Sequence, residues 1–266
     1  MSDPKTPAHE HNRRAWDSMV KNQRRFTKPA EDKDLHDPLA TVDGSGWLGG
    51  DISGQKVLCL AAGGGRQSVI YAAAGAEVTV VDISGAMLEL DRQVASERKM
   101  NIRTVEASMD YMPMLKDGEF DLVIHPVSTC YVPQITPVFV EVARVLRGQG
   151  LYISQHKQPT SMQADTEPSE NGYELLEPYY RSGPLPQVEN SLHREAGTME
   201  FLHRWEEILG GMCRAGFVIE DLTEPFHAKE DRGAGTFGHR SRFVAPYVRI
   251  KARRTGTSQG KSKLIV

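Results

Sequence analysis

Residues 57–82 read VLCLAAGGGRQSVIYAAAGAEVTVVD and place three consecutive glycines between two strongly apolar runs. The apolar runs at residues 56–60 and 77–81 are short and rich in valine and leucine, as is typical of buried β-strands. Between them, residues 66–74 have a helical composition, and the glycine that follows ends such a helix. The stretch therefore predicts a strand, a glycine turn, a helix and a second strand, which is the repeating unit of a parallel α/β sheet.

The three glycines, Gly63, Gly64 and Gly65, indicate a ligand that approaches the main chain. Glycine leaves room for close contact and accepts φ angles above zero, and the start of the next helix directs N–H groups toward the turn. Asp82 stands nineteen positions after Gly63, where a carboxylate can accept hydrogen bonds from both hydroxyls of a ribose. A plain tight turn with a surface aspartate is the alternative, but the strand context favours a nucleotide site.

Length and charge limit the classes of protein to consider. The chain has 266 residues, enough for one large α/β domain or for a domain with a substantial insertion. Its net charge of −3 gives no general attraction for nucleic acid or anionic lipid, so we expect no nucleic-acid partner. No apolar run approaches the roughly 20 residues of a membrane span, and the polar first residues do not resemble a signal peptide.

Cysteines and histidines suggest neither a disulfide framework nor a metal centre. The three cysteines, Cys59, Cys130 and Cys213, are an odd number and lie far apart, which favours a cytoplasmic, reducing location. Among nine histidines only His9 and His11 are closely spaced, in a polar start that we expect to be mobile. We therefore predict no metal, and we leave the oligomeric state open.

The alternation of strands and helices continues along the chain. Ser84 is expected to cap a helix over residues 85–98, and Thr136 with Pro137 to begin another. Further strands are expected at residues 102–106, 120–124, 150–155, 216–222 and 244–254. The last two have no helical pattern between them, so we expect them to pair antiparallel. The prediction is a doubly wound α/β fold with a seven-stranded, mostly parallel sheet whose last strand is antiparallel.

The alternation of strands and helices stops after the fifth strand, where about fifty residues are rich in proline and tyrosine. Such an insertion at the ligand side of an open sheet predicts an inserted lid. Residues 1–12 are expected to be mobile, with a short helix after them. The predicted division is an N-terminal helical cap (1–54), a cofactor-binding half (55–156), the lid (157–200), the completion of the sheet (201–254) and a flexible tail (255–266).

The glycine turn does not match the dinucleotide pattern G-x-G-x-x-G, because Ser68 stands where the third glycine is required. It resembles instead the class I S-adenosylmethionine-dependent methyltransferases. Their first strand and turn usually read as an apolar run, an acid and then G-x-G-x-G. In this chain Cys59 stands at the usual acid and Ala61 at the usual first glycine, so main-chain carbonyls would anchor the methionine amino group of the cofactor.

Other segments are similar to the same family. VEASMDYMP (105–113) resembles the adenine loop, FDLVIHPVS (120–128) the fourth strand and its exit, and EVARVLRGQGLYIS (141–154) the helix and fifth strand. PYVRIKARR (246–254) resembles the reversed last strand. The resemblance implies that the cofactor is S-adenosyl-L-methionine. It implies a cofactor site made of Ala62, Gly63, Gly64, Gly65, Asp82, Ile83, Met87, Ser108, Met109, Asp110 and Pro126.

The acceptor side is less defined. His156 is expected at the carboxyl edge of the fifth strand, beside His125 and Tyr131, and an imidazole is suited to accept the proton that a hydroxyl or amine releases. These three are the candidate catalytic residues, although both histidines fit equally a role as hydrogen-bonded core residues. Arg240 and Arg242 are candidates for gripping an anionic substrate.

We interpret the chain as a methyltransferase that acts on a small polar molecule, with oxygen, nitrogen or sulfur as the acceptor atom. Two alternatives remain at this point. One is a nicotinamide-dependent oxidoreductase, and the other is a non-enzymatic protein that binds an adenosyl ligand.

Overall fold

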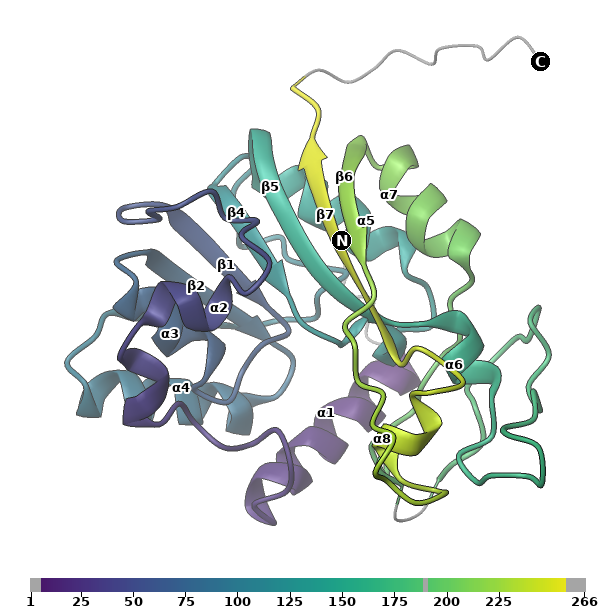
Figure 1. Ribbon diagram of the computed structural model, residues 1–266. Helices are drawn as coiled ribbons and strands as arrows, with labels where there is room; N and C mark the ends of the chain where they lie inside the picture. Colours follow the sequence, from purple (N-terminus) through teal and green to yellow (C-terminus); the bar gives the residue numbers. More distant parts are fainter. Residues whose placement is uncertain (1–5, 189–190, 257–266) are drawn as a thin grey trace, which may run out of the picture.

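The structure is a computed structural model that describes residues 6–188 and 191–256 (Figure 1). Its centre is a seven-stranded sheet with the order β3-β2-β1-β4-β5-β7-β6. Strands β1 to β5 pair in parallel, and β7 runs antiparallel to β5 and β6, which confirms the predicted fold class. The strands are β1 (Lys56–Leu60), β2 (Glu77–Asp82), β3 (Ile102–Glu106), β4 (Phe120–His125), β5 (Leu146–Lys157), β6 (Phe217–Thr223) and β7 (Tyr247–Arg254).

Helices cover both faces of the sheet. α3 and α4 contact β2 and β3 on one face, with α2 packed on α3, and α5 and α7 contact β5 and β6 on the other. The helices are α1 (Pro7–Lys21), η1 (Asp32–Leu35), α2 (Pro38–Val42), α3 (Gln67–Ala73), α4 (Gly85–Glu97), η2 (Thr129–Tyr131), α5 (Thr136–Val145), α6 (Pro159–Gln163), the π-helical η3 (Glu206–Gly210), α7 (Gly211–Arg214) and α8 (Phe237–Arg240).

Side-chain alternation along the strands fills two cores. In β1, Val57 and Cys59 pack toward α3 and α4, whereas Leu58 and Leu60 pack toward α5 and α7. All four are fully buried, because successive side chains of a strand point to opposite faces and both faces of this sheet are covered. The apolar run that predicted a buried parallel strand is thus explained by burial on both sides.

The segments outside the sheet gather at one edge. Figure 1 shows α1, α6 and α8 near the edge where the parallel strands end, together with the connections that follow β5 and β6. In open α/β sheets this is the edge that binds ligands. Among the described residues, no helix is both long enough and apolar enough to cross a membrane.

The N-terminal segment differs from the prediction of a mobile start. α1 begins at Pro7, because Thr6 caps it and exchanges hydrogen bonds with His9 in a capping box. His9 and Asn12 are buried, so the close-spaced histidines belong to a packed helix. Residues 1–5 and 257–266, to which part of the predicted mobile start and most of the predicted tail belong, lie outside the described residues.

Boundaries near β5 also differ. Leu146 has extended backbone and pairs with Phe120 of β4, so α5 ends at Val145 and the strand begins earlier than the predicted residue 150. Ile135, and not Thr136, occupies the cap position of α5. Ser84 caps α4 as predicted, since its hydroxyl accepts the N–H of Met87 at 3.1 Å.

Candidate active site

The glycine turn between β1 and α3 has a backbone that restricts its residues. Gly64 and Gly65 have φ angles of +112° and +71°, and Ala61 also lies in the left-handed region, with φ of +47°. At Gly63 the restriction is space. A Cβ there would lie 2.8 Å from the Cβ of Met87 and 3.0 Å from Oδ2 of Asp82. Only glycine fits at that position without a shift of its neighbours.

Gly64 and Gly65 lie on the side of the turn that packs against α4, and they do not line the cavity described below. The N–H of Gly64 donates to Oδ2 of the buried Asp91 at 2.9 Å, and the hydroxyl of Ser68 donates to the other oxygen. A Cβ on Gly65 would lie 3.0 Å from the carbonyl oxygen of Leu90. Ser68, which breaks the dinucleotide pattern, therefore helps to fix the turn against α4.

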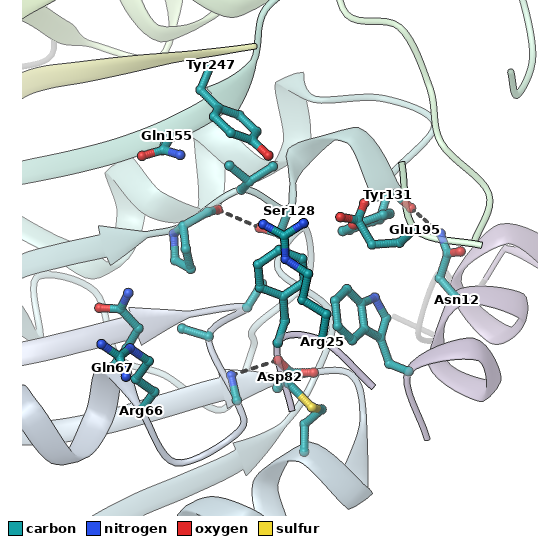
Figure 2. A pocket seen from close by; sticks show the side chains of 18 of the residues that line it. Asn12, Arg25, Arg66, Gln67, Asp82, Ser128, Tyr131, Gln155, Glu195 and Tyr247 are labelled. Atoms are coloured by element: carbon teal, nitrogen blue, oxygen red, sulfur yellow. Dashed lines mark hydrogen bonds between the residues drawn. The ribbon is translucent and has the colours of Figure 1, made fainter. Parts of the chain in front are cut away.

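Asp82 ends β2 and directs its carboxylate at the turn (Figure 2). Its Oδ2 accepts the N–H of Gly63 and its Oδ1 accepts the N–H of Ser84, each at 2.9 Å. Burial raises the pKa of this carboxyl to about 6. Each carboxylate oxygen has two lone pairs, so these bonds do not use the full acceptor capacity of the group.

A cavity of about 1170 Å³ lies beside this carboxylate (Figure 2). Most of the predicted cofactor residues line it, namely Ala62, Gly63, Asp82, Ile83, Met87, Ser108, Met109 and Pro126. Asp110 does not. Its carboxylate accepts the hydroxyl of Ser108 at 2.5 Å and lies 3.0 Å from Nε2 of His9, so it connects the loop after β3 to α1.

The residues at this end of the cavity fit S-adenosyl-L-methionine. The side-chain-free Gly63 leaves the main chain accessible, and the carboxylate of Asp82 would hold the ribose hydroxyls of such a cofactor. Ile83, Met87 and Met109 add apolar side chains to the same end of the cavity. Ala61 lines the cavity and adopts the φ that its place in the turn requires, although it is not glycine.

The two candidate histidines lie outside the lining of the cavity. His156 is buried, with Nδ1 2.8 Å from the Thr129 hydroxyl and Nε2 2.8 Å from the Ser154 hydroxyl. His125 is buried likewise, between the hydroxyls of Tyr152 at 2.8 Å and Ser128 at 2.7 Å. Burial lowers the pKa of His125 to about 3 and that of His156 well below its usual value. Both rings are therefore neutral, hydrogen-bonded core groups.

Tyr131 does line the cavity and belongs to a buried charged network that the sequence did not predict. Its hydroxyl donates to Oε2 of Glu195 at 2.8 Å, and Nζ of Lys157 donates to the same oxygen at 2.9 Å. Lys157 also pairs with Glu200, which pairs with Arg194. The network joins η2, the end of β5 and the insertion, and Glu195 faces the cavity (Figure 2).

Helix α1 also contributes to the cavity through His9, Asn12 and Trp16, which no sequence pattern marked. The Asn12 amide donates to the carbonyl of Tyr131 at 2.8 Å and to that of Met199 at 2.9 Å, and its oxygen accepts the N–H of Met199 at 2.7 Å. The helix is thereby fastened to η2 and to the insertion. Its signal in the sequence was the Thr-Pro start, which predicts a helix but not its partners.

The arginine proposed to grip a substrate has a structural role. Arg240 is buried and donates to the carbonyl oxygens of Asp165, Ser161 and Ala164 at 2.8 to 2.9 Å. It holds the start of the insertion against α8. Arg242 is exposed and does not line the cavity.

Comparisons of the sequence with known proteins agree with this geometry. A family model described as a methyltransferase domain matches residues 58–154. The chain is 34% identical over 229 residues to an uncharacterized methyltransferase, YbaJ, of Bacillus subtilis strain 168, covering 80% of this chain and 89% of the relative. It is 27% identical over 170 residues to a ubiquinone biosynthesis O-methyltransferase of Alkalilimnicola ehrlichii, covering 60% of this chain and 68% of that protein.

Solved structures share the fold. A geranyl diphosphate C-methyltransferase from Streptomyces coelicolor, crystallised with Mg²⁺, geranyl diphosphate and S-adenosyl-L-homocysteine, has a TM-score of 0.64 at 18% identity over 95% of this chain and 100% of that one. An S-adenosylmethionine-dependent methyltransferase structure from Listeria monocytogenes has a TM-score of 0.62 at 18% identity over 77% of this chain and 92% of that one.

Neither alternative considered from the sequence, a nicotinamide-dependent oxidoreductase or a non-enzymatic binding protein, is supported by these comparisons. The chain has a turn position, Gly63, with no room for a Cβ, a reversed last strand, and a methyltransferase relative along most of its length. It therefore belongs to the class I methyltransferases that use S-adenosyl-L-methionine as their cofactor.

Proposed function

We propose that the protein methylates a small polar molecule that occupies the part of the cavity farthest from Asp82. The continuity of the cavity carries this proposal, because Gly63 and Asp82 line the same space as Tyr131 and Glu195. Figure 2 shows Asp82 at one end of that space and Tyr247 at the other. A volume of about 1170 Å³ exceeds what most single drug-sized ligands need, so it leaves room for cofactor and acceptor together.

The cofactor residues follow from this arrangement. We assign the ribose to Asp82, the adenine to the wall formed by Met109 and Ser108, and the methionine end to Gly63. The cofactor wall is completed by Ala62, Ile83, Met87 and Pro126. Gly64, Gly65 and Asp110 act indirectly, by holding the turn and the loop after β3 in place.

The cofactor supplies a methyl group already activated by its sulfonium, so the chain must mainly position the acceptor and exclude water. Aromatic side chains suited to this task line the acceptor part of the cavity, from helix α1, η2, α8 and β7. They are Trp16, Tyr131, Phe237 and Tyr247.

An acceptor hydroxyl or amine must also lose a proton by the end of the transfer. We assign this proton to the carboxylate of Glu195. Burial raises the pKa of Glu195, but the charge of Lys157 at 2.9 Å outweighs it and lowers the pKa, so the carboxylate is ionised at neutral pH. Tyr131 positions Glu195, because burial raises the phenol pKa well above 10 and keeps the hydroxyl a donor.

Ligand binding and turnover test the proposal in two steps. S-adenosyl-L-homocysteine should raise the melting temperature of the protein, and NAD should not; the reverse result would contradict the cofactor assignment. The formation of S-adenosyl-L-homocysteine from S-adenosyl-L-methionine is then measured with a panel of small phenols, alcohols, amines and thiols. Absence of turnover across the panel, in a protein that binds the cofactor, would favour a binding role.

A further inference from the structure

The wall of the cavity carries more positive than negative side chains. Five cationic residues line it, namely Arg25, Lys28, Arg66, Lys229 and Arg232. The acidic side chains on the wall are Asp82, at the cofactor end, and Glu195. The imbalance depends on which of these charges are already paired within the protein.

Several charges are compensated. Arg66 makes two hydrogen bonds to Asp34, at 2.7 and 2.9 Å, and Glu195 is paired with Lys157 at 2.9 Å. Arg232 lies 3.9 Å from the neighbouring Asp231. Within residues 6–188 and 191–256, no ion pair engages Arg25, Lys28 or Lys229. Among the residues that the structure describes, these three bring positive charge to the cavity without an ion-pair partner.

Arg25 is the best placed of the three. Figure 2 shows its side chain extending into the cavity, between Asp82 and the end occupied by Gln155 and Tyr247. Its guanidinium carbon lies 4.7 Å from the ring centroid of Phe26, which supports it over an aromatic face. Burial raises the pKa of Tyr247, and the positive charges of Lys157 and Arg25 oppose that rise, so the charge of Arg25 acts on the acceptor end.

We infer that the methyl acceptor carries an oxyanion, a carboxylate or a phosphate, and that Arg25 binds it with help from Lys229. The inference rests on the proposed function and names its substrate class. A guanidinium presents a planar fork of donors that matches an oxyanion with two parallel hydrogen bonds. Lys229 belongs to the connection between β6 and α8, a different wall of the same cavity. The aromatic lining then holds the remainder of the acceptor.

One competing role for Arg25 must be separated from this one. The cofactor itself has a carboxylate on its methionine end, and an arginine at the cavity could bind that group. Methylthioadenosine contains the adenosine and the methylthio group but no amino-acid end. Comparing its affinity with that of S-adenosyl-L-homocysteine measures the contribution of the amino-acid end, which includes the cofactor carboxylate.

The experiment uses calorimetry on the wild type, Arg25→Gln and the matched control Arg24→Gln, whose side chain is exposed and does not line the cavity. Each protein is saturated with S-adenosyl-L-homocysteine and titrated with matched probes. In the carboxylate set, 3,4-dihydroxybenzoate is the anionic probe, catechol its neutral partner and 3,4-dihydroxybenzylamine its cationic counterpart. In the phosphate set, phenyl phosphate is the anionic probe and phenol its neutral partner. The wild type and Arg24→Gln should bind an anionic probe at least tenfold more tightly than its neutral partner, and Arg25→Gln should lose this preference. A preference confined to 3,4-dihydroxybenzoate assigns a carboxylate, and one confined to phenyl phosphate assigns a phosphate.

Three results would overturn the inference and leave the proposed function in place. Neutral probes could bind the wild type as tightly as anionic ones, or Arg25→Gln could keep the preference. Arg25→Gln could instead weaken S-adenosyl-L-homocysteine and leave methylthioadenosine unchanged, which would place Arg25 on the cofactor. A wild type that does not bind S-adenosyl-L-homocysteine at all would contradict the proposed function itself, and the inference with it.

Discussion

At the scale of single residues, the cofactor end depends on one position that has no room for a side chain. A Cβ on Gly63 would approach the Cβ of Met87 to 2.8 Å, which no rotamer change relieves because both atoms are fixed by backbone. Gly63→Ala should therefore weaken S-adenosyl-L-homocysteine binding by at least tenfold in calorimetry. Gly44→Ala is the matched control, since nothing lies within 4 Å of a Cβ there. Equal affinity of the two variants would show that the turn tolerates a displacement.

The proton acceptor is a second residue with a direct test. Glu195→Gln removes the negative charge and keeps the shape, so the single-turnover methylation rate should fall by about a hundredfold with any acceptor that supports turnover. The affinity for S-adenosyl-L-homocysteine should stay unchanged. Glu177→Gln, which alters a half-buried pair with Arg181 outside the cavity, is the control. A wild-type rate in Glu195→Gln would return Glu195 to a purely structural role.

The histidine prediction shows where residue-level reasoning fails. Side chains alternate along β5, and Gln155 faces the cavity while His156 faces the opposite core, 6.1 Å from the ring centroid of Phe139. The sequence placed His156 at the end of the correct strand, but it did not show to which face of the sheet the His156 side chain points. The positions of Asp82 and Gly63 at the cavity were predictable because they follow from a contiguous strand–turn–helix pattern. Glu195 was not, because it reaches the cavity from an insertion without periodicity.

At the scale of elements, helix α1 connects η2 to the insertion that follows β5. Asn12 is buried and makes three hydrogen bonds to the main chain of Tyr131 and Met199. Asn12→Ala leaves those groups without partners, which should lower the free energy of unfolding by about 1–3 kcal/mol. Urea denaturation measures this change. Asn22→Ala is the control, because Asn22 is exposed and its side chain bonds locally, to Ser18 one helical turn earlier.

The elements of the sheet were largely predictable, and the segments that cover it were not. Continuous apolar runs mark strands buried on both faces, and the glycine turn fixes where the first helix begins. α1 and the insertion are held by single polar side chains such as Asn12 and Lys157, whose partners are far away in the sequence. Such long-range pairs leave no local pattern to detect.

At the scale of the whole molecule, buried neutral histidines couple stability to pH. The pKa of His156 is depressed in the folded state, so lowering the pH below about 6.5 adds protons to the unfolded chain alone and lowers stability. His156→Gln removes this contribution. The variant should be less stable than the wild type at pH 7.5, and the difference should shrink by about 1.4 kcal/mol at pH 5.5.

Urea denaturation at the two pH values measures the effect, with the exposed His36→Gln as the control. A stability difference that stays constant between pH 7.5 and 5.5 would mean that His156 titrates alike in the folded and unfolded states.

The buried carboxyls of Asp82 and Asp91 have the opposite pH dependence. Burial raises the pKa of each to about 6, so their contribution to stability falls as the pH rises from about 4.

One measurement tests most directly whether this fold binds the cofactor at the end of β2. S-adenosyl-L-homocysteine is titrated by calorimetry into the wild type and Asp82→Ala, each shown to be folded by circular dichroism. One carboxylate oxygen of Asp82 accepts the N–H of Gly63 in the turn and the other accepts that of Ser84 at the start of α4. A charge-assisted hydrogen bond to a ligand is worth on the order of 1.5–3 kcal/mol. The wild type should bind, and Asp82→Ala should bind roughly ten- to a hundredfold more weakly. An unchanged affinity in the folded variant would contradict the ribose site at the end of β2.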